Sequence, residues 1–163
     1  MILEKNKMKQ LEIPDKRKIF VGVEIGSKEI KYGFINLYGK LIHVEKQTIL
    51  NEPGNEAGLL IGSIRGIRGE LNLRFKNFVG ICICFTNKEN KIENFGQQLS
   101  QNLNIPVYVE DRDYLRQLGE DWLIKMGDKI DLKGWNISIN FNVIYGGARF
   151  LIENTHKTED QNK

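Results

Sequence analysis

The stretch that decides the fold is residues 21–31, VGVEIGSKEIK. Its two apolar runs are rich in Val and Ile and are separated by a Gly-Ser-Lys turn, a pattern typical of a tight β-hairpin. A third β-rich run, 41–45, follows a second turn at residues 38–40. The sequence therefore predicts a three-strand antiparallel meander that begins near Phe20.

Helical periods and apolar runs alternate after the meander. Apolar residues recur at steps of three and four over residues 55–72, which predicts a crossover helix. The continuous apolar run 77–85 is typical of a strand buried on both faces. Later segments predict a helix around 92–103, a short strand at 107–109, a helix around 115–126 and a closing hairpin over 135–153 that turns at Gly146-Gly147. The expected fold is α/β, a mixed sheet with flanking helices, as in the ribonuclease H-like half-domain of actin-like ATPases.

Length and charge limit the class of protein. The 163 residues, 40% of them apolar, suit one globular domain. The net charge is +3, and residues 1–18 hold six Lys and Arg against three acids, so the rest of the chain is neutral. We therefore expect a basic leader at 1–18, a lobe at 19–154 and a polar tail at 155–163, with no direct binding of nucleic acid.

Cysteines and apolar runs indicate the compartment. Cys82 and Cys84 are too close together for a disulfide framework, and the N-terminus has no signal-peptide pattern. No apolar run approaches the roughly 20 residues of a membrane helix. We expect a cytoplasmic protein without a membrane span, and we expect no metal site because the two His residues lack partners at metal-ligand spacing.

Several motifs, in the right order, resemble the ROK family of repressors and sugar kinases. Residues 21–40 are similar to the first phosphate loop of that family, and residues 105–120 are similar to the segment that carries its catalytic Asp. Gly146-Gly147 stands where a second phosphate loop should follow. The resemblance covers about residues 10–154 and implies the N-terminal nucleotide-binding lobe of an actin-like protein, with ATP and magnesium as the implied cofactors.

The resemblance also implies site residues. Glu24 takes the place of the strand acid that holds magnesium, and the candidates for phosphate or nucleotide binding are Glu24, Gly26, Ser27, Lys28, Gly146 and Gly147. Ser27 and Lys28 replace a Gly and a Thr of the family pattern, and the second loop has lost its other glycines. An alternative, which we favour, is that residues 26–28 form only a hairpin turn, because small and polar residues suit such turns.

The general base of the family kinases falls on Arg112 in this chain. A guanidinium stays protonated and cannot accept the proton of a sugar hydroxyl. Asp111 would serve only if the motif had slipped by one residue, and we favour the alternative that it caps the following helix. No catalytic residue is assigned, and the kinase motifs are interpreted as degenerate.

Three functions follow as hypotheses. The first is a non-catalytic sugar- or nucleotide-sensing or assembly module related to ROK regulators, without their DNA-binding domain, and with a homodimer or a second-lobe chain as partner. Phe150, Ile152 and the Gly58, Gly62 and Gly66 face would then supply an exposed surface. The second is an ATP-dependent sugar kinase lobe that needs a second chain. The third, more remote, is a ribonuclease H-like nuclease of the resolvase type. Glu24 and Asp111 would be its metal-holding acids, and the closing hairpin does not match the helix that ends such proteins.

Overall fold

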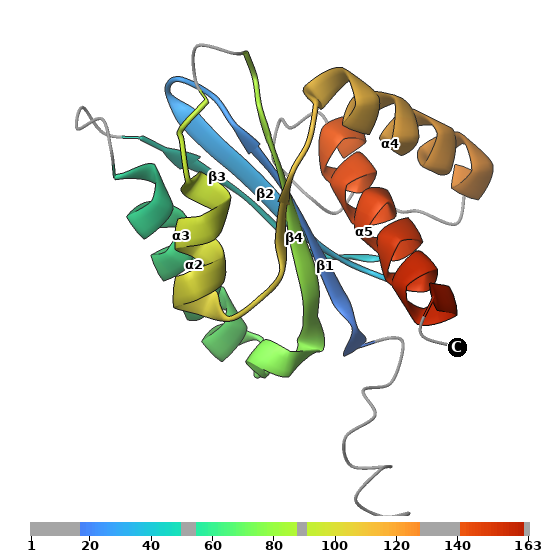
Figure 1. Ribbon diagram of the computed structural model, residues 1–163, viewed down its shortest axis with the longest axis horizontal. Coiled ribbons are helices and arrows are strands. Elements are labelled where there is room, and N and C mark those ends of the chain that lie inside the picture. The colour runs from blue at the N-terminus through green and yellow to red at the C-terminus, as the bar shows by residue number, and fades with distance from the viewer. Residues whose placement is uncertain (1–16, 50–54, 88–90, 128–140, 162–163) are drawn as a thin grey trace, which may run out of the picture.

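The computed structural model describes residues 17–49, 55–87, 91–127 and 141–161, and the side chains of that last segment as far as Thr155. Within these residues a mixed five-stranded sheet lies between two layers of helices (Figure 1). None of the helices in the described part of the chain is both long and apolar enough to cross a membrane.

The sheet confirms the predicted meander. Strands β1 (Ile19–Ile25), β2 (Glu29–Asn36) and β3 (Leu41–Thr48) pair antiparallel in chain order. Strand β4 (Phe78–Phe85) and the short β5 (Val107–Val109) continue the sheet parallel to β1, in the order β3-β2-β1-β4-β5. The apolar run expected to be a buried strand is β4, and it lies between two neighbours as predicted.

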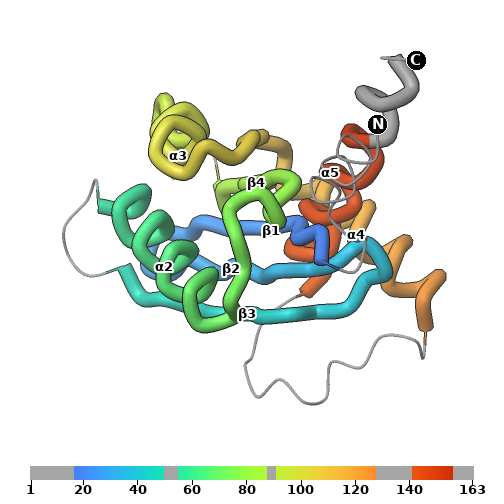
Figure 2. The backbone as a smooth tube through the Cα atoms, turned by 90° about the horizontal axis from the view of Figure 1, so that it is seen from below, coloured from blue at the N-terminus to red at the C-terminus, as the bar shows by residue number. Residues whose placement is uncertain are grey.

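Helices cover both faces of the sheet. Helices α2 (Glu56–Glu70) and α3 (Phe95–Leu103) lie on one face, and α4 (Arg112–Met126) and α5 (Phe141–Gln161) lie on the other (Figure 2). The apolar positions that predicted the crossover helix include the buried residues of α2, which are Leu60, Ile64 and Ile67. Each face of the sheet therefore has its own apolar core. A short 3-10 helix, η2 (Phe75–Asn77), comes directly before β4 in the chain.

The predicted closing hairpin is wrong, because its described residues, 141–153, belong to α5; residues 135–140 lie outside the described part of the chain. The Gly146-Gly147 pair, which suggested a turn, serves close packing instead. A Cβ on Gly146 would lie 1.7 Å from the Leu115 carbonyl oxygen of α4, and one on Gly147 would lie 3.1 Å from the Gly22 Cα of β1. Glycine lets this helix approach both neighbours, and its buried Ile144, Ala148 and Leu151 have a helical period that sequence reasoning overlooked.

Helix α5 changes two further expectations. It continues to Gln161, so the expected boundary at residue 154 falls inside it. Ile152 is buried and is no part of an exposed patch, whereas Phe150 is half-buried against the rings of Tyr108 and Tyr114, at 5.6 and 6.4 Å between centroids. On α2, the glycine face of residues 58, 62 and 66 is exposed, as expected.

Candidate functional site

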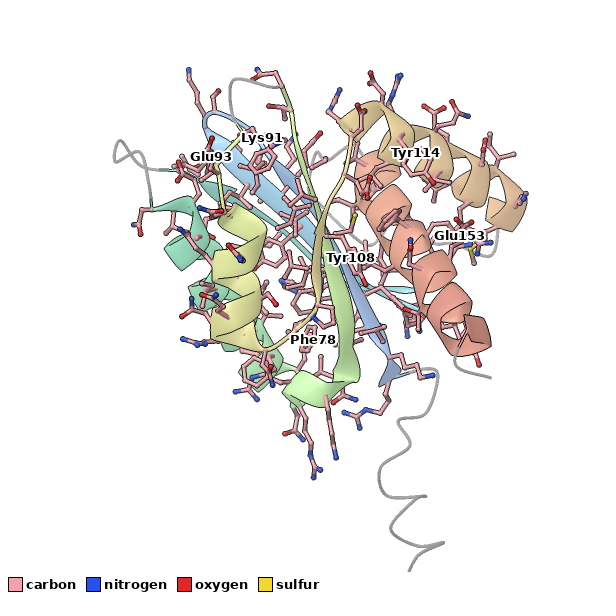
Figure 3. The ribbon with its side chains drawn as sticks, viewed as in Figure 1. Phe78, Lys91, Glu93, Tyr108, Tyr114 and Glu153 are labelled. Atoms are coloured by element: carbon pink, nitrogen blue, oxygen red, sulfur yellow. The ribbon has the colours of Figure 1, made fainter. Side chains whose placement is uncertain are left out.

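The candidate site lies at the sheet edge where the parallel strands β1, β4 and β5 end. One hollow of about 410 Å³ is bounded by the residues after β4 and by the β5–α4 junction, and its lining includes Lys91, Asp111 and Arg112. A second hollow, of about 320 Å³, lies beside the β1–β2 turn. Thr86 lines both hollows, so they adjoin. Figure 3 shows Lys91 at this end of the molecule.

Glu24 is the buried acid of this edge, with 4% of its surface exposed. Its Oε2 accepts a hydrogen bond from Nε of Arg112 at 2.7 Å, and its Oε1 lies 3.7 Å from Nζ of Lys31. Lys31 faces Glu24 across the β1–β2 ladder, and Arg112 is the first residue of α4. The strand acid is therefore held between two cations.

Electrostatics around Glu24 follow from this arrangement. The hydrogen bond to Glu24 raises the pKa of Arg112, so its guanidinium is even less able to act as a base. Burial, followed by the nearby Glu24 charge, raises the pKa of Cys84 to about 12. Cys84 and its neighbour Cys82 are free and buried, which agrees with inert core thiols.

Asp111 is the N-cap of α4. Its Oδ1 accepts hydrogen bonds from the backbone N–H of Asp113 at 2.7 Å and of Tyr114 at 3.4 Å. These bonds satisfy two of the donors that a helix start leaves without partners. The capping interpretation of Asp111 is confirmed, although the residue also lines the larger hollow.

In the turn at residues 26–28, Ser27 and Lys28 form a two-residue hairpin loop between Gly26 and Glu29. The N–H of Gly26 donates to the Glu29 carbonyl at 2.8 Å, so this amide closes the hairpin and is not directed at a ligand. Ser27 and Lys28 are exposed, and they line the smaller hollow together with Glu24 and Gly26. Four of the six candidate residues therefore lie together, whereas Gly146 and Gly147 pack inside the α5 contacts with α4 and the sheet. A role of the four residues in phosphate binding remains a prediction.

Sequence reasoning missed the two cations that hold Glu24. Lys31 could have been found, because a two-residue turn fixes the β1–β2 register and places it opposite Glu24. Arg112 is 88 residues away in the chain, and only the β5–α4 connection brings it to the same edge.

A magnesium ion does not fit this site. Hard cations take several oxygen ligands that are not already neutralised, whereas both oxygens of Glu24 face a cation of the protein itself. In the part of the chain that the structure describes, no group of three or more His, Cys, Asp or Glu side chains could hold a metal ion.

Comparisons with known proteins place the fold. No protein-family profile and no curated protein sequence matches the chain. Among solved structures, a ROK hexokinase from Thermus thermophilus matches with a TM-score of 0.53 and 19% identity, over 64% of this chain and 37% of that one. A ROK-family transcriptional regulator, a homologue of the E. coli MLC protein, matches with a TM-score of 0.53 and 15% identity, over 64% and 30%.

The fold is ROK-like. The chain spans about a third of the length of these ROK proteins, and at such low identity the likeness concerns the fold alone. The RuvC protein of T. thermophilus, in complex with a Holliday junction substrate, shares the fold over a longer stretch. Its TM-score is 0.56 at 13% identity, and the match covers 85% of this chain and 96% of that one. The ROK-like fold of this chain is thus a ribonuclease H-like layer structure, as expected from the order of its elements.

Proposed function

We propose that this ROK-like chain is a non-catalytic module that binds a sugar or nucleotide ligand, or supports assembly, in the manner of a regulator. The observation that carries the proposal is the hydrogen bond of 2.7 Å between Arg112 and Glu24. This bond ties up the acid that the family resemblance assigns to magnesium, and it puts a permanent cation where that resemblance requires the general base.

The chemistry of phosphoryl transfer explains why this observation supports a non-catalytic role. Such transfer requires electrostatic stabilisation of the phosphoryl group, usually by a metal, and a residue that accepts the proton of the nucleophile. Glu24 is already neutralised by Arg112 and Lys31, and the Asp111 carboxylate accepts the amides of the first turn of α4. An ATP-dependent kinase would have to replace both functions, even if a second chain supplied another lobe.

The smaller hollow is the proposed ligand site. Lys28 contributes an exposed cation to its lining and Ser27 contributes a hydroxyl, and both can contact the phosphate of a nucleotide or of a sugar phosphate. Lys31 also lines the hollow, where it balances the charge of Glu24. Occupation of such a site changes local charge without any chemical turnover, and that is sufficient for a sensing module. A homodimer or a second-lobe chain remains part of the proposal as the partner that would receive the signal.

The first prediction is binding without turnover. In a coupled assay with ATP, magnesium and glucose, N-acetylglucosamine or mannose, the rate should equal that of the no-enzyme control, because Arg112 cannot accept a proton. A fluorescent ATP analogue without magnesium should still bind, and Lys28→Glu should weaken its binding about fivefold, as expected for loss of one phosphate contact of about 1 kcal/mol. Sugar turnover that Asp111→Asn abolishes would show a slipped base and refute the proposal.

A second candidate is a nuclease of the resolvase type. Two observations favour it: the match to RuvC covers 96% of that protein, and helix α5 now closes the fold where the sequence had suggested a hairpin. The site does not favour it, because metal-dependent cleavage needs several carboxylates together and Glu24 is already paired. Incubation with a labelled four-way DNA junction and Mg²⁺ or Mn²⁺ distinguishes the nuclease from the binding module. We expect no cleavage of the junction.

A further inference from the structure

The end of the molecule opposite the candidate site collects positive charge. The parallel strands β1 and β4 both begin there, since Ile19 pairs with Phe78, and α2 and α3 both end there. We call this end the basic pole and define it as residues 17–18 and 65–77. Its cations are Arg17, Lys18, Arg65, Arg68, Arg74 and Lys76, and its single acid is Glu70. Figure 3 shows side chains with nitrogen at their tips gathered below Phe78.

The charge of the chain is therefore segregated. The basic pole carries six positive charges and one negative charge, a net +5, and residues 1–16 carry four Lys against three acids, a net +1. Because the whole chain is +3, all the other residues together are −3. The neutral sum expected for residues 19–163 thus hides a strongly positive end and a negative remainder, which only the fold separates in space.

Several arginines of the basic pole are held in fixed directions. Arg17 donates to the Asn72 carbonyl at 3.3 Å, Arg65 to the Asn102 carbonyl at 2.9 Å and Arg68 to the Leu73 carbonyl at 3.0 Å. Asn72 and Leu73 follow the last turn of α2, and Asn102 lies in the last turn of α3. Carbonyl groups at helix C-termini attract cations. A guanidinium has five donor hydrogens, so one such bond leaves donors for a ligand while it reduces the entropy lost on binding.

Two further cations of the basic pole are exposed to solvent. Arg74 and Lys76 are exposed on either side of Phe75, whose ring is stacked under the Arg68 guanidinium at 4.4 Å. The large apolar side chains that are exposed in the described residues (Tyr38, Tyr108, Val109, Tyr114 and Ile124) all belong to other segments. The surface of the basic pole thus offers positive charge and planar guanidinium groups, without an apolar anchor.

This chemistry identifies the kind of partner. Stable membrane binding combines cations with apolar side chains that insert, and protein interfaces depend on buried aromatic or aliphatic anchors. Binding to the phosphodiester backbone of a nucleic acid needs only cations over one surface, because counterion release supplies the affinity. We propose that the basic pole binds the backbone of a nucleic acid without sequence specificity. This function is independent of the ligand proposed for the opposite edge.

Fluorescence anisotropy with a labelled 20-base-pair DNA duplex tests the proposal on the full chain. We expect binding at low salt, with an affinity that falls steeply as salt rises. The variant Arg74→Glu/Lys76→Glu should weaken binding at least tenfold at 50 mM salt, and the slope of log K against log salt should become shallower by about two, one for each lost phosphate contact.

A matched control keeps the test specific. Lys46→Glu/Arg116→Glu makes the same change of net charge at two surface cations outside the basic pole, whose side chains are 38% and 49% exposed and paired with Glu29 and Asp113. Equal weakening by this control would overturn the proposal, because net charge alone would then explain binding. The proposal would also be overturned if the chain did not bind the duplex at 50 mM salt. The same holds if the chain binds phosphatidylserine vesicles but not DNA, and the Arg74→Glu/Lys76→Glu variant loses the vesicle binding. Unchanged circular dichroism of both variants confirms that each is folded.

Discussion

Replacing Gly146 with Ala is expected to lower the free energy of unfolding by about 3 kcal/mol or more, the upper range for an overpacked site. The new methyl group would lie 1.7 Å from the Leu115 carbonyl oxygen and 2.5 Å from its carbon. Both atoms belong to the backbone of α4, so no side chain can rotate out of the way. Either α5 moves away from α4, which opens the core around Tyr145, or the helix pair does not form. Urea denaturation followed by circular dichroism measures the loss.

The same substitution at Gly62 is the control. Gly62 also lies inside a helix, but a Cβ at this exposed position of α2 would meet nothing within 4 Å apart from its chain neighbours and the nearby backbone of its own helix. Ala is the better helix former by about 1 kcal/mol, so Gly62→Ala should raise the free energy of unfolding by about 0.5–1 kcal/mol. Equal and small effects of the two substitutions would contradict the close approach of α5 to α4.

Replacing Arg112 with Leu is the prediction with the second largest effect. Glu24 is almost fully buried, and the substitution leaves Lys31, at 3.7 Å, as the cation beside it. A buried carboxylate that loses its hydrogen-bonded partner keeps its desolvation penalty without the compensating attraction. We expect the free energy of unfolding to fall by about 2 kcal/mol, less than for a fully buried pair, because the Arg112 side chain is 37% exposed and the pair is partly screened.

Replacing the acid of this ion pair should lower the free energy of unfolding less than replacing the arginine. Glu24→Leu leaves behind a guanidinium that reaches water, so we expect a loss of about 1 kcal/mol. The double variant Glu24→Leu/Arg112→Leu should be more stable than the sum of the single losses implies, because neither charge is then left alone. Thermal and urea unfolding of the four proteins completes the cycle. Additive losses, or a larger loss for Glu24→Leu than for Arg112→Leu, would contradict the ion-pair account of this site.

Both predictions concern features that make the site unlike a kinase site. Gly146 and Gly147 stand where the family resemblance expected a second phosphate loop, and here they let a helix pack closely on its neighbours. Arg112 stands where it expected the catalytic base, and here it neutralises the strand acid Glu24. Residue types that the resemblance assigns to phosphate chemistry therefore take part in packing and charge balance, in line with the proposed non-catalytic module.

Local patterns in the sequence determined much of the fold. Alternating apolar runs and two short turns are sufficient to specify the meander, since each strand pairs with its neighbour in the chain. The period of Leu60, Ile64 and Ile67 specified α2, and the Asp111 cap specified where α4 begins. In each case the physical cause acts within a few residues, so the sequence displays it directly.

The tertiary structure decided what depends on distant segments. Gly146-Gly147 is compatible with a turn or with a tight helix contact, and only the position of Leu115 and Gly22 selects the contact. The pairing of Glu24 with Arg112 joins residues 88 apart, and the basic pole gathers charges from two separate segments. A sequence records the sum of its charges and the types of its residues, whereas their distances, which set electrostatic and packing energies, exist only in the folded chain.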